Sequence, residues 1–142
     1  MNQHDYLMQQ ILSDTFIVYM KSLHTHWNMQ DERFYFLHRM VEEQHKELLE
    51  FIDLIAERIR QKGLFAPKSL KEILSLKSQE ETHQIESGTQ MLLNLKNSYE
   101  KLSIATLNFI EICGKDYVTQ DIMIEFSRFI DKTIWILKSH LN

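Results

Sequence analysis

Residues 34–62 read FYFLHRMVEEQHKELLEFIDLIAERIRQK, and this stretch decides the fold of the chain. Apolar residues recur along it every three or four positions, which is the period of an amphipathic helix. Basic residues in its last turn and Gly63 just beyond it are typical helix stop signals. A helix of this length extends roughly 43 Å, at about 1.5 Å per residue. Its core-facing stripe is expected to contain Leu37, Val41, Leu48, Ile52, Ile55 and Ile59, with His45 on the same line.

Three more long helices are predicted on either side of this stretch. One runs from about Asp5 to Asn28, and another from about Thr119 to Leu141. Between them, a capping box at residues 78–81 is expected to open a helix that ends at Gly114. The inward positions of that helix follow a heptad-like rhythm and are predicted to be Ile85, Gly88, Leu92, Leu95, Tyr99, Leu102, Thr106, Phe109 and Cys113.

The middle connection is longer than the other two. Residues 64–78 contain the only proline, and a further capping box at 69–72 predicts a short helix within them. Four long helices with one long crossover that contains a short helix describe an all-α, ferritin-like four-helix bundle. No internal repeat or shift in composition divides the chain, so a single domain over residues 1–142 is predicted.

The composition favours an all-helical protein and argues against several other classes. The 142 residues include only three glycines and one proline, too few for the many turns of a β-rich fold. No signal peptide or membrane-spanning run is recognisable, and the single cysteine permits no intrachain disulfide, so a cytoplasmic protein is expected. The net charge is −4, and neither end of the chain carries the concentrated basic arm typical of nucleic-acid binding.

The 34–62 stretch also carries residue types that suit a divalent first-row metal. His38 and Glu42 are four positions apart, and so are Asp53 and Glu57, so each pair shares one face of the helix. His26 lies near the end of the preceding helix. Imidazole nitrogens and carboxylate oxygens, without thiolates, are donors that suit a metal such as iron. These five residues are therefore the candidate metal ligands and catalytic residues.

The two pairs lie too far apart to serve one ion within a single chain. Glu42 and Asp53 are separated by about 16 Å along the helix axis. They lie symmetrically about the point between residues 47 and 48, and His38 and Glu57 lie symmetrically about the same point. If two copies of the helix cross antiparallel there, each pair faces the other pair of the partner subunit, and two equivalent shared sites result. On spacing alone, a solvated acidic face with an incidental histidine stays open as the alternative.

Several motifs spread along the chain match one known family. They are HWNM at 26–29, Phe34, Leu37-His38, Glu42, DLIAERI at 53–59, SLKE at 69–72 and DKTIW at 131–135. On these residues the chain resembles the Dps family of mini-ferritins, also called DNA-binding proteins from starved cells, over nearly its whole length. The resemblance implies a hollow shell of twelve subunits with 23 symmetry, built from two-fold dimers.

The same resemblance assigns the candidate ligands to two subunits. Ferroxidase centres at the two-fold interfaces would take His26, His38 and Glu42 from one subunit. The second subunit would supply Asp53 and Glu57. Trp27 would pack beside the site, and an ordinary core tryptophan is an alternative that is compatible with this position. Fe(II) would be oxidised with hydrogen peroxide or dioxygen, and ferric mineral would be stored inside the shell. This activity would protect DNA even without contact.

The resemblance also implies acidic pores at three-fold axes, near the start of the last helix. The candidate pore residues are Asp116, Asp121 and Glu125. The chain departs from the family pattern at Asp31, in the first turn, and at Gly114-Lys115-Asp116. The first departure affects the expected turn geometry and the second affects the pore assignment, while neither touches a proposed ligand.

Related di-iron proteins suggest a rival arrangement of ligands. They use Glu-x-x-His strings inside one bundle, and residues 42–45 and 80–83 both match that pattern. The first helix contains no glutamate, however, so we interpret the two strings as coincidental. His45 is then either a supporting group at the dimer interface or an ordinary packed or solvated histidine.

Two functions other than iron oxidation are alternatives for this sequence. A DNA-compacting nucleoid protein of this family would use a Lys-rich tail, and this chain has none, so weak or absent DNA binding is predicted while nucleoid association stays open. A helical scaffold or antigen with a decayed metal site is disfavoured because the whole ligand set is present.

Overall fold

The computed structural model describes residues 1–81 and 84–141. Its helices are α1 (Gln3–Asn28), α2 (Phe34–Gln61), α3 (Leu70–Leu76), α4 (Gly88–Ile112) and α5 (Tyr117–Ser139). The predicted all-α bundle of four long helices, with a short helix in the crossover, is confirmed. Among the described helices, none combines the length and apolarity needed to cross a membrane.

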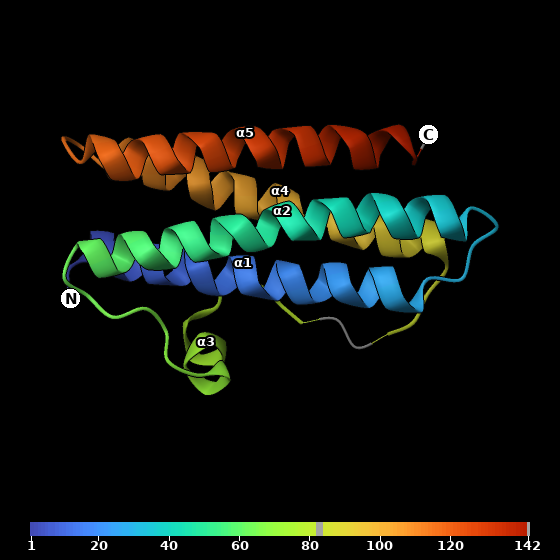
Figure 1. The fold of residues 1–142 in the computed structure, drawn as a ribbon, viewed down its shortest axis with the longest axis horizontal. Helices are drawn as coiled ribbons and strands as arrows, with labels where there is room; N and C mark the ends of the chain where they lie inside the picture. The colour runs from blue at the N-terminus through green and yellow to red at the C-terminus, as the bar shows by residue number, and fades with distance from the viewer. Residues whose placement is uncertain (82–83, 142) are drawn as a thin grey trace.

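The crossover sets the direction of the second helix pair. Figure 1 shows α1 and α2 side by side and antiparallel, and α4 and α5 likewise. The chain between α2 and α4 returns along the bundle, so α2 and α4 run in the same direction. Two glutamine side chains of α1 hold this crossover, because Gln9 donates to the carbonyl of Phe65 and Gln10 to that of Leu76. The short helix α3 therefore lies against α1, outside the bundle.

The core confirms the apolar stripe predicted for α2, except that Ile52 is only partly buried. Leu37, Val41, Leu48, Ile55 and Ile59 are fully buried, and they join buried residues of α1, α4 and α5 in one cluster. Both predicted glycine stops are also confirmed, because Gly63 and Gly114 follow α2 and α4 with φ of 88° and 57°. These are left-handed conformations that a residue without a Cβ adopts easily.

The predicted start of α4 at Ser78 is wrong. The helix begins at Gly88, and the side chain of Ser87 accepts the capping hydrogen bond from the backbone N–H of Gln90. The hydroxyl and backbone N–H of Ser78 instead donate to the buried carboxylate of Asp14 on α1. Ser78 therefore ties the crossover to α1 and does not cap a helix. Ile85, predicted to face inward, is 66% exposed in this non-helical segment.

The turn between α1 and α2 is fixed by an aspartate. Asp31 accepts hydrogen bonds from the backbone N–H and the guanidinium of Arg33. Its side chain also lies so close to Gly88 that a Cβ there would come within 2.5 Å of an Asp31 oxygen. The start of α4 thus packs on this turn. The turn also sets how the end of α1 meets the start of α2.

Candidate metal centre

His26 and His38 form the central pair of the candidate site. Their rings stack at a centroid distance of 3.7 Å and an interplanar angle of 9°. The Nδ1 of His26 donates to the carbonyl of His38 (2.8 Å), and the Nδ1 of His38 donates to the carbonyl of His26 (2.7 Å). With both Nδ1 atoms used as donors, the Nε2 of each ring is the nitrogen with a free lone pair. Metal-binding histidines are commonly oriented by a carbonyl in this way.

Glu42 lies one helical turn beyond His38. Its carboxylate forms an ion pair with Lys46 at 3.2 Å. The hydrogen bond and charge of Lys46 lower the pKa of Glu42, with smaller contributions from His26 and His38. The carboxylate is therefore ionised at neutral pH and provides a hard oxygen donor beside the two imidazoles.

His45 belongs to the same cluster. The sequence alone had left its position open. Its ring lies edge-on to His26, at a centroid distance of 5.1 Å, and edge-on to Tyr19 at 5.8 Å. The residue is only 7% exposed, so the interpretation as a solvated histidine is wrong. Burial lowers the pKa of His45, and His26 lowers it further. The sequence signal for this position is its place on the core-facing line of the helix, seven residues after His38.

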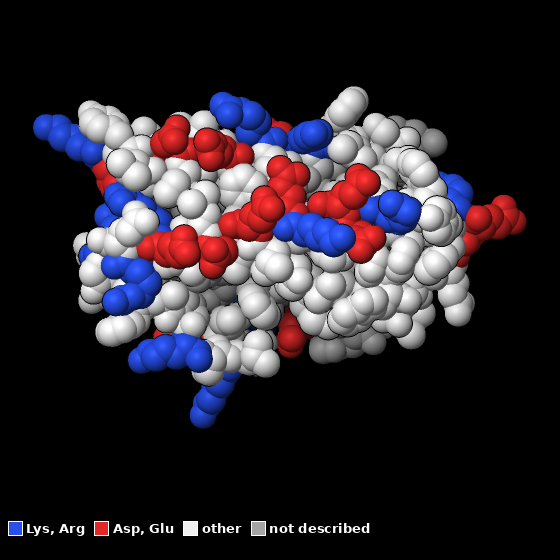
Figure 2. Space-filling view, viewed as in Figure 1, with Lys and Arg blue, Asp and Glu red and all other residues white. Residues whose placement is uncertain are grey.

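Asp53 and Glu57 lie on the exposed surface, further along α2. Figure 2 shows acidic side chains following α2 across this face of the molecule. Because α2 is one continuous helix, Asp53 stays about 16 Å from Glu42 along its axis. Within the described residues of one chain, no three histidine, cysteine, aspartate or glutamate side chains converge on a common point. The donors of a single chain therefore fall into two separate groups.

Two other predictions, for Trp27 and for the Glu-x-x-His strings, are only partly met. Trp27 is 58% exposed, so it is not a core tryptophan of the single chain. The Glu-x-x-His string at 42–45 does bring Glu42 and His45 into one cluster, while the second string includes Thr82 and His83, which lie outside the described residues.

Asp116, one of the three pore candidates, is held inside an ion-pair cluster. Its carboxylate accepts hydrogen bonds from Arg58 and Lys62 at the end of α2, and from Thr119 in the first turn of α5. Burial alone raises the pKa of Asp116, but the hydrogen bonds from these three residues outweigh burial and hold it well below its usual range. Asp116 thus joins two helices. The other two candidates, Asp121 and Glu125, are exposed on α5.

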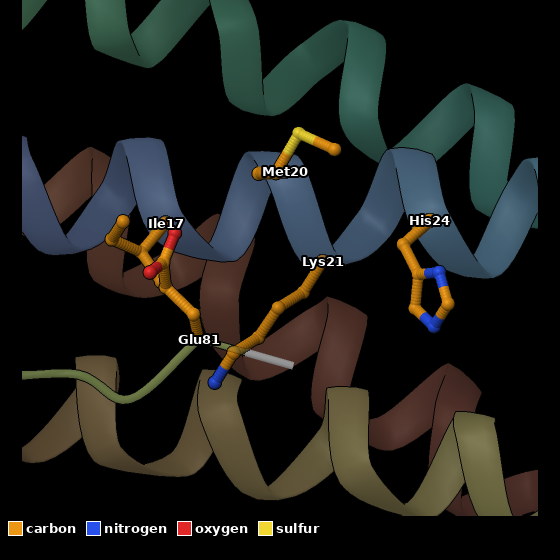
Figure 3. Close-up of a pocket in the computed structure, with 5 residues that line it drawn as sticks. All are labelled: Ile17, Met20, Lys21, His24 and Glu81. Atoms are coloured by element: carbon orange, nitrogen blue, oxygen red, sulfur yellow. The ribbon is translucent and has the colours of Figure 1, made fainter. Parts of the chain in front are cut away.

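A separate cavity of about 100 Å³ lies beside α1, against the segment that leads to α4. Figure 3 shows Lys21 and His24 pointing from α1 toward α4, with Glu81 coming from the connecting segment. The Nζ of Lys21 donates to the hydroxyl of Ser98 at 2.9 Å. None of the candidate metal ligands lines this cavity, so it is not part of the metal centre.

The donor set of the cluster fits iron. It combines imidazole nitrogens of fixed orientation with an ionised carboxylate and no thiolate, which suits a first-row divalent metal. The fold points the same way, because the family model of the Ferritin-like domain matches residues 6–142. The bundle is thus a ferritin-like domain.

Individual relatives narrow this class. The DNA protection during starvation protein of Listeria monocytogenes is 34% identical over 121 residues, which cover 82% of this chain and 78% of that protein. The crystal structure of Dps from Staphylococcus aureus matches with a TM-score of 0.92 at 30% identity, over 99% of this chain and 97% of that chain. The Dps of Vibrio cholerae O1, described as one of the ferritin-like diiron-carboxylate proteins, matches with a TM-score of 0.93 at 25% identity, over 99% and 89%. The chain belongs to the Dps branch of the ferritin-like family, as its motifs indicated.

The Asp116 cluster leads to a pH-dependent stability prediction. Replacing Asp116 with asparagine should lower the free energy of unfolding by about 2 kcal/mol at pH 7, because charged hydrogen bonds are lost. A carboxylate with a depressed folded pKa stabilises the protein above its unfolded value of 3.8, and that stabilisation is lost as the pH falls below it. Urea unfolding of wild type and variant should therefore show a gap at pH 7 that narrows toward pH 3.

The control for this prediction is Asp121→Asn, which removes an exposed carboxylate of the same helix. Its free energy of unfolding should stay within about 0.5 kcal/mol of wild type. An Asp116→Asn gap that is equal at pH 7 and pH 3, or absent at pH 7, would contradict the assignment of these ion pairs.

Proposed function

We propose that this protein is a ferroxidase and iron-storing mini-ferritin. Each centre takes His26, His38 and Glu42 from one chain. The partner's Asp53 and the partner's Glu57 complete it. Iron is the substrate, and the oxidised product is stored as ferric mineral inside a closed shell built from two-fold dimers, for which twelve subunits is the family number.

The single observation that carries this proposal is the reciprocal pairing of His26 and His38. The Nδ1 of each ring donates a hydrogen bond to the other residue's backbone carbonyl. The Nε2 of each ring therefore keeps a lone pair that can bind a metal ion. The Dps of Vibrio cholerae O1, described as a member of the superfamily of ferritin-like diiron-carboxylate proteins, supports a metal role for this fold.

The geometry of α2 supports the shared site. The helix runs from Phe34 to Gln61, so its midpoint falls between residues 47 and 48, where the candidate pairs are symmetric. Two copies that cross antiparallel at this midpoint bring the exposed Asp53 and Glu57 of one chain to the histidine cluster of the other. The ligand set of each centre then includes three carboxylates, which stabilise the additional charge of Fe(III).

The proposed reaction is electron transfer from iron to an oxidant. Two Fe(II) ions give up two electrons, which reduce one hydrogen peroxide molecule, and with two protons it forms two water molecules. Paired electron delivery avoids the one-electron reduction that releases hydroxyl radical, and this limits damage to DNA and the cell. Dioxygen is the alternative oxidant. The chain's own contribution is to hold the two ions with oriented nitrogen and oxygen donors.

Cations would reach the inside of the shell through acidic pores. Asp121 and Glu125 are exposed one turn apart near the start of α5, and a ring of such carboxylates attracts cations. Asp116 is a weaker candidate for this role, because Arg58 and Lys62 already neutralise its charge.

The central experiment on this function is anaerobic Fe(II) loading followed by hydrogen peroxide. Wild type should oxidise the iron rapidly, and a His38→Ala, Asp53→Ala double variant should be slower by about ten-fold or more. A His140→Ala, Glu111→Ala double variant also removes one histidine and one carboxylate, but outside the assigned set, and should keep the wild-type rate. Stopped-flow absorbance of Fe(III) measures all three. A wild-type rate in the first double variant would rule out the assigned ligands.

DNA compaction is the second candidate function, since relatives carry the name DNA protection during starvation protein. The chain has a net charge of −4. We therefore expect no complex with duplex DNA at moderate salt and at most a weak one at low salt, since phosphate binding depends on basic contacts. A gel shift at both salt concentrations tests this. A tight complex that survives moderate salt would refute it.

A further inference from the structure

His45 is a buried imidazole without a hydrogen-bond partner. It is 7% exposed, and neither its Nδ1 nor its Nε2 has a partner among the described residues. Buried polar side-chain atoms in native proteins are nearly always hydrogen-bonded, so this side chain needs a specific explanation. The groups around it come from α1 and α2. They are the rings of Tyr19 and His26 and the charged side chains of Glu42 and Lys46.

The spacing of the three imidazoles separates their roles. A metal ion about 2.1 Å from one nitrogen in each of two rings leaves the ring centroids roughly 5 Å apart. The centroids of His26 and His45 are 5.1 Å apart, with the rings at 76° to each other. The centroids of the stacked His26 and His38 rings are only 3.7 Å apart, and the rings are nearly parallel. This spacing is shorter than the roughly 5 Å expected for two rings that share one ion. His26 therefore pairs better with His45 than with His38 around a single ion.

We propose that His26 and His45 together bind one metal ion of the centre, while His38 and Glu42 bind the other. This inference rests on the proposed ferroxidase function and adds His45 to its ligands. An ion held by two imidazoles has a softer donor set than one held by carboxylates and water alone. The centre would therefore retain Fe(II), Co(II) or Zn(II) at that position and discriminate against Mg(II) and Ca(II).

Co(II) titration of the assembled wild-type protein, without iron or oxidant, tests this assignment. Calorimetry and the visible absorption of Co(II) should show two Co(II) ions per centre. In His45→Phe, a ring of similar size keeps the contacts with Tyr19 and His26 but supplies no nitrogen. This variant should bind one of the two ions about ten-fold or more weakly, with a changed Co(II) spectrum. A His45→Phe protein with wild-type affinity, stoichiometry and spectrum would overturn the proposal.

Two controls separate this proposal from the proposed function. His4→Phe makes the same change about 33 Å from His26 along α1 and should leave Co(II) binding unchanged. Asp53→Ala should weaken Co(II) binding if the shared centre exists. If Asp53→Ala behaves as wild type, the proposed function fails. If Asp53→Ala weakens binding and His45→Phe does not, only the role of His45 fails.

A measurement on wild type avoids any dependence on how the variant folds. Anomalous diffraction from crystals of the wild-type protein soaked in Co(II) should place an ion within bonding distance of a His45 nitrogen. If the ions at the centre contact His26, His38 and the carboxylates but none contacts His45, the proposal is overturned.

Discussion

The proposed metal centre depends on the rigidity of one helix. Because α2 is continuous from Phe34 to Gln61, its two groups of donor side chains are held about 16 Å apart along the axis, and no local rearrangement of a single chain can join them. The histidine group is covered by α1, whereas Asp53 and Glu57 remain exposed. A metal centre that uses both groups therefore requires a second subunit, and assembly becomes a condition for the chemistry.

The rest of the fold serves to place the histidine group. The turn between α1 and α2 is held by Asp31 and by the close packing of Gly88, and it brings His26 and His38 into reciprocal hydrogen bonds. Two other carboxylates hold the frame together: Asp14 ties the crossover to α1, and Asp116 ties α2 to α5. Each is buried or half-buried and hydrogen-bonded, as charged groups in a protein interior must be.

Local sequence signals predicted most of the fold. The bounds of α2, its buried stripe and the glycines after α2 and α4 follow from periodicity and backbone preference, which act over a few residues. The start of α4 was predicted wrongly because Ser78 donates hydrogen bonds to Asp14. This partner is 64 residues away, and no local pattern reveals it. The burial of His45 was left open between a packed and a solvated position, because it depends on the packing of Tyr19 and His26 from another helix. The five assigned ligands remain a prediction.

The most direct test of the central claim, a centre shared between two chains, is co-assembly of inactive subunits. His38→Ala and Asp53→Ala proteins should each oxidise Fe(II) no faster than the protein-free reaction. In a randomly mixed assembly with equal amounts of both, one intact centre forms in every mixed dimer, so about a quarter of the wild-type activity should return. If each centre belonged to one chain, every chain in the mixture would still lack a ligand. A mixed assembly that stays as inactive as its components would contradict the account.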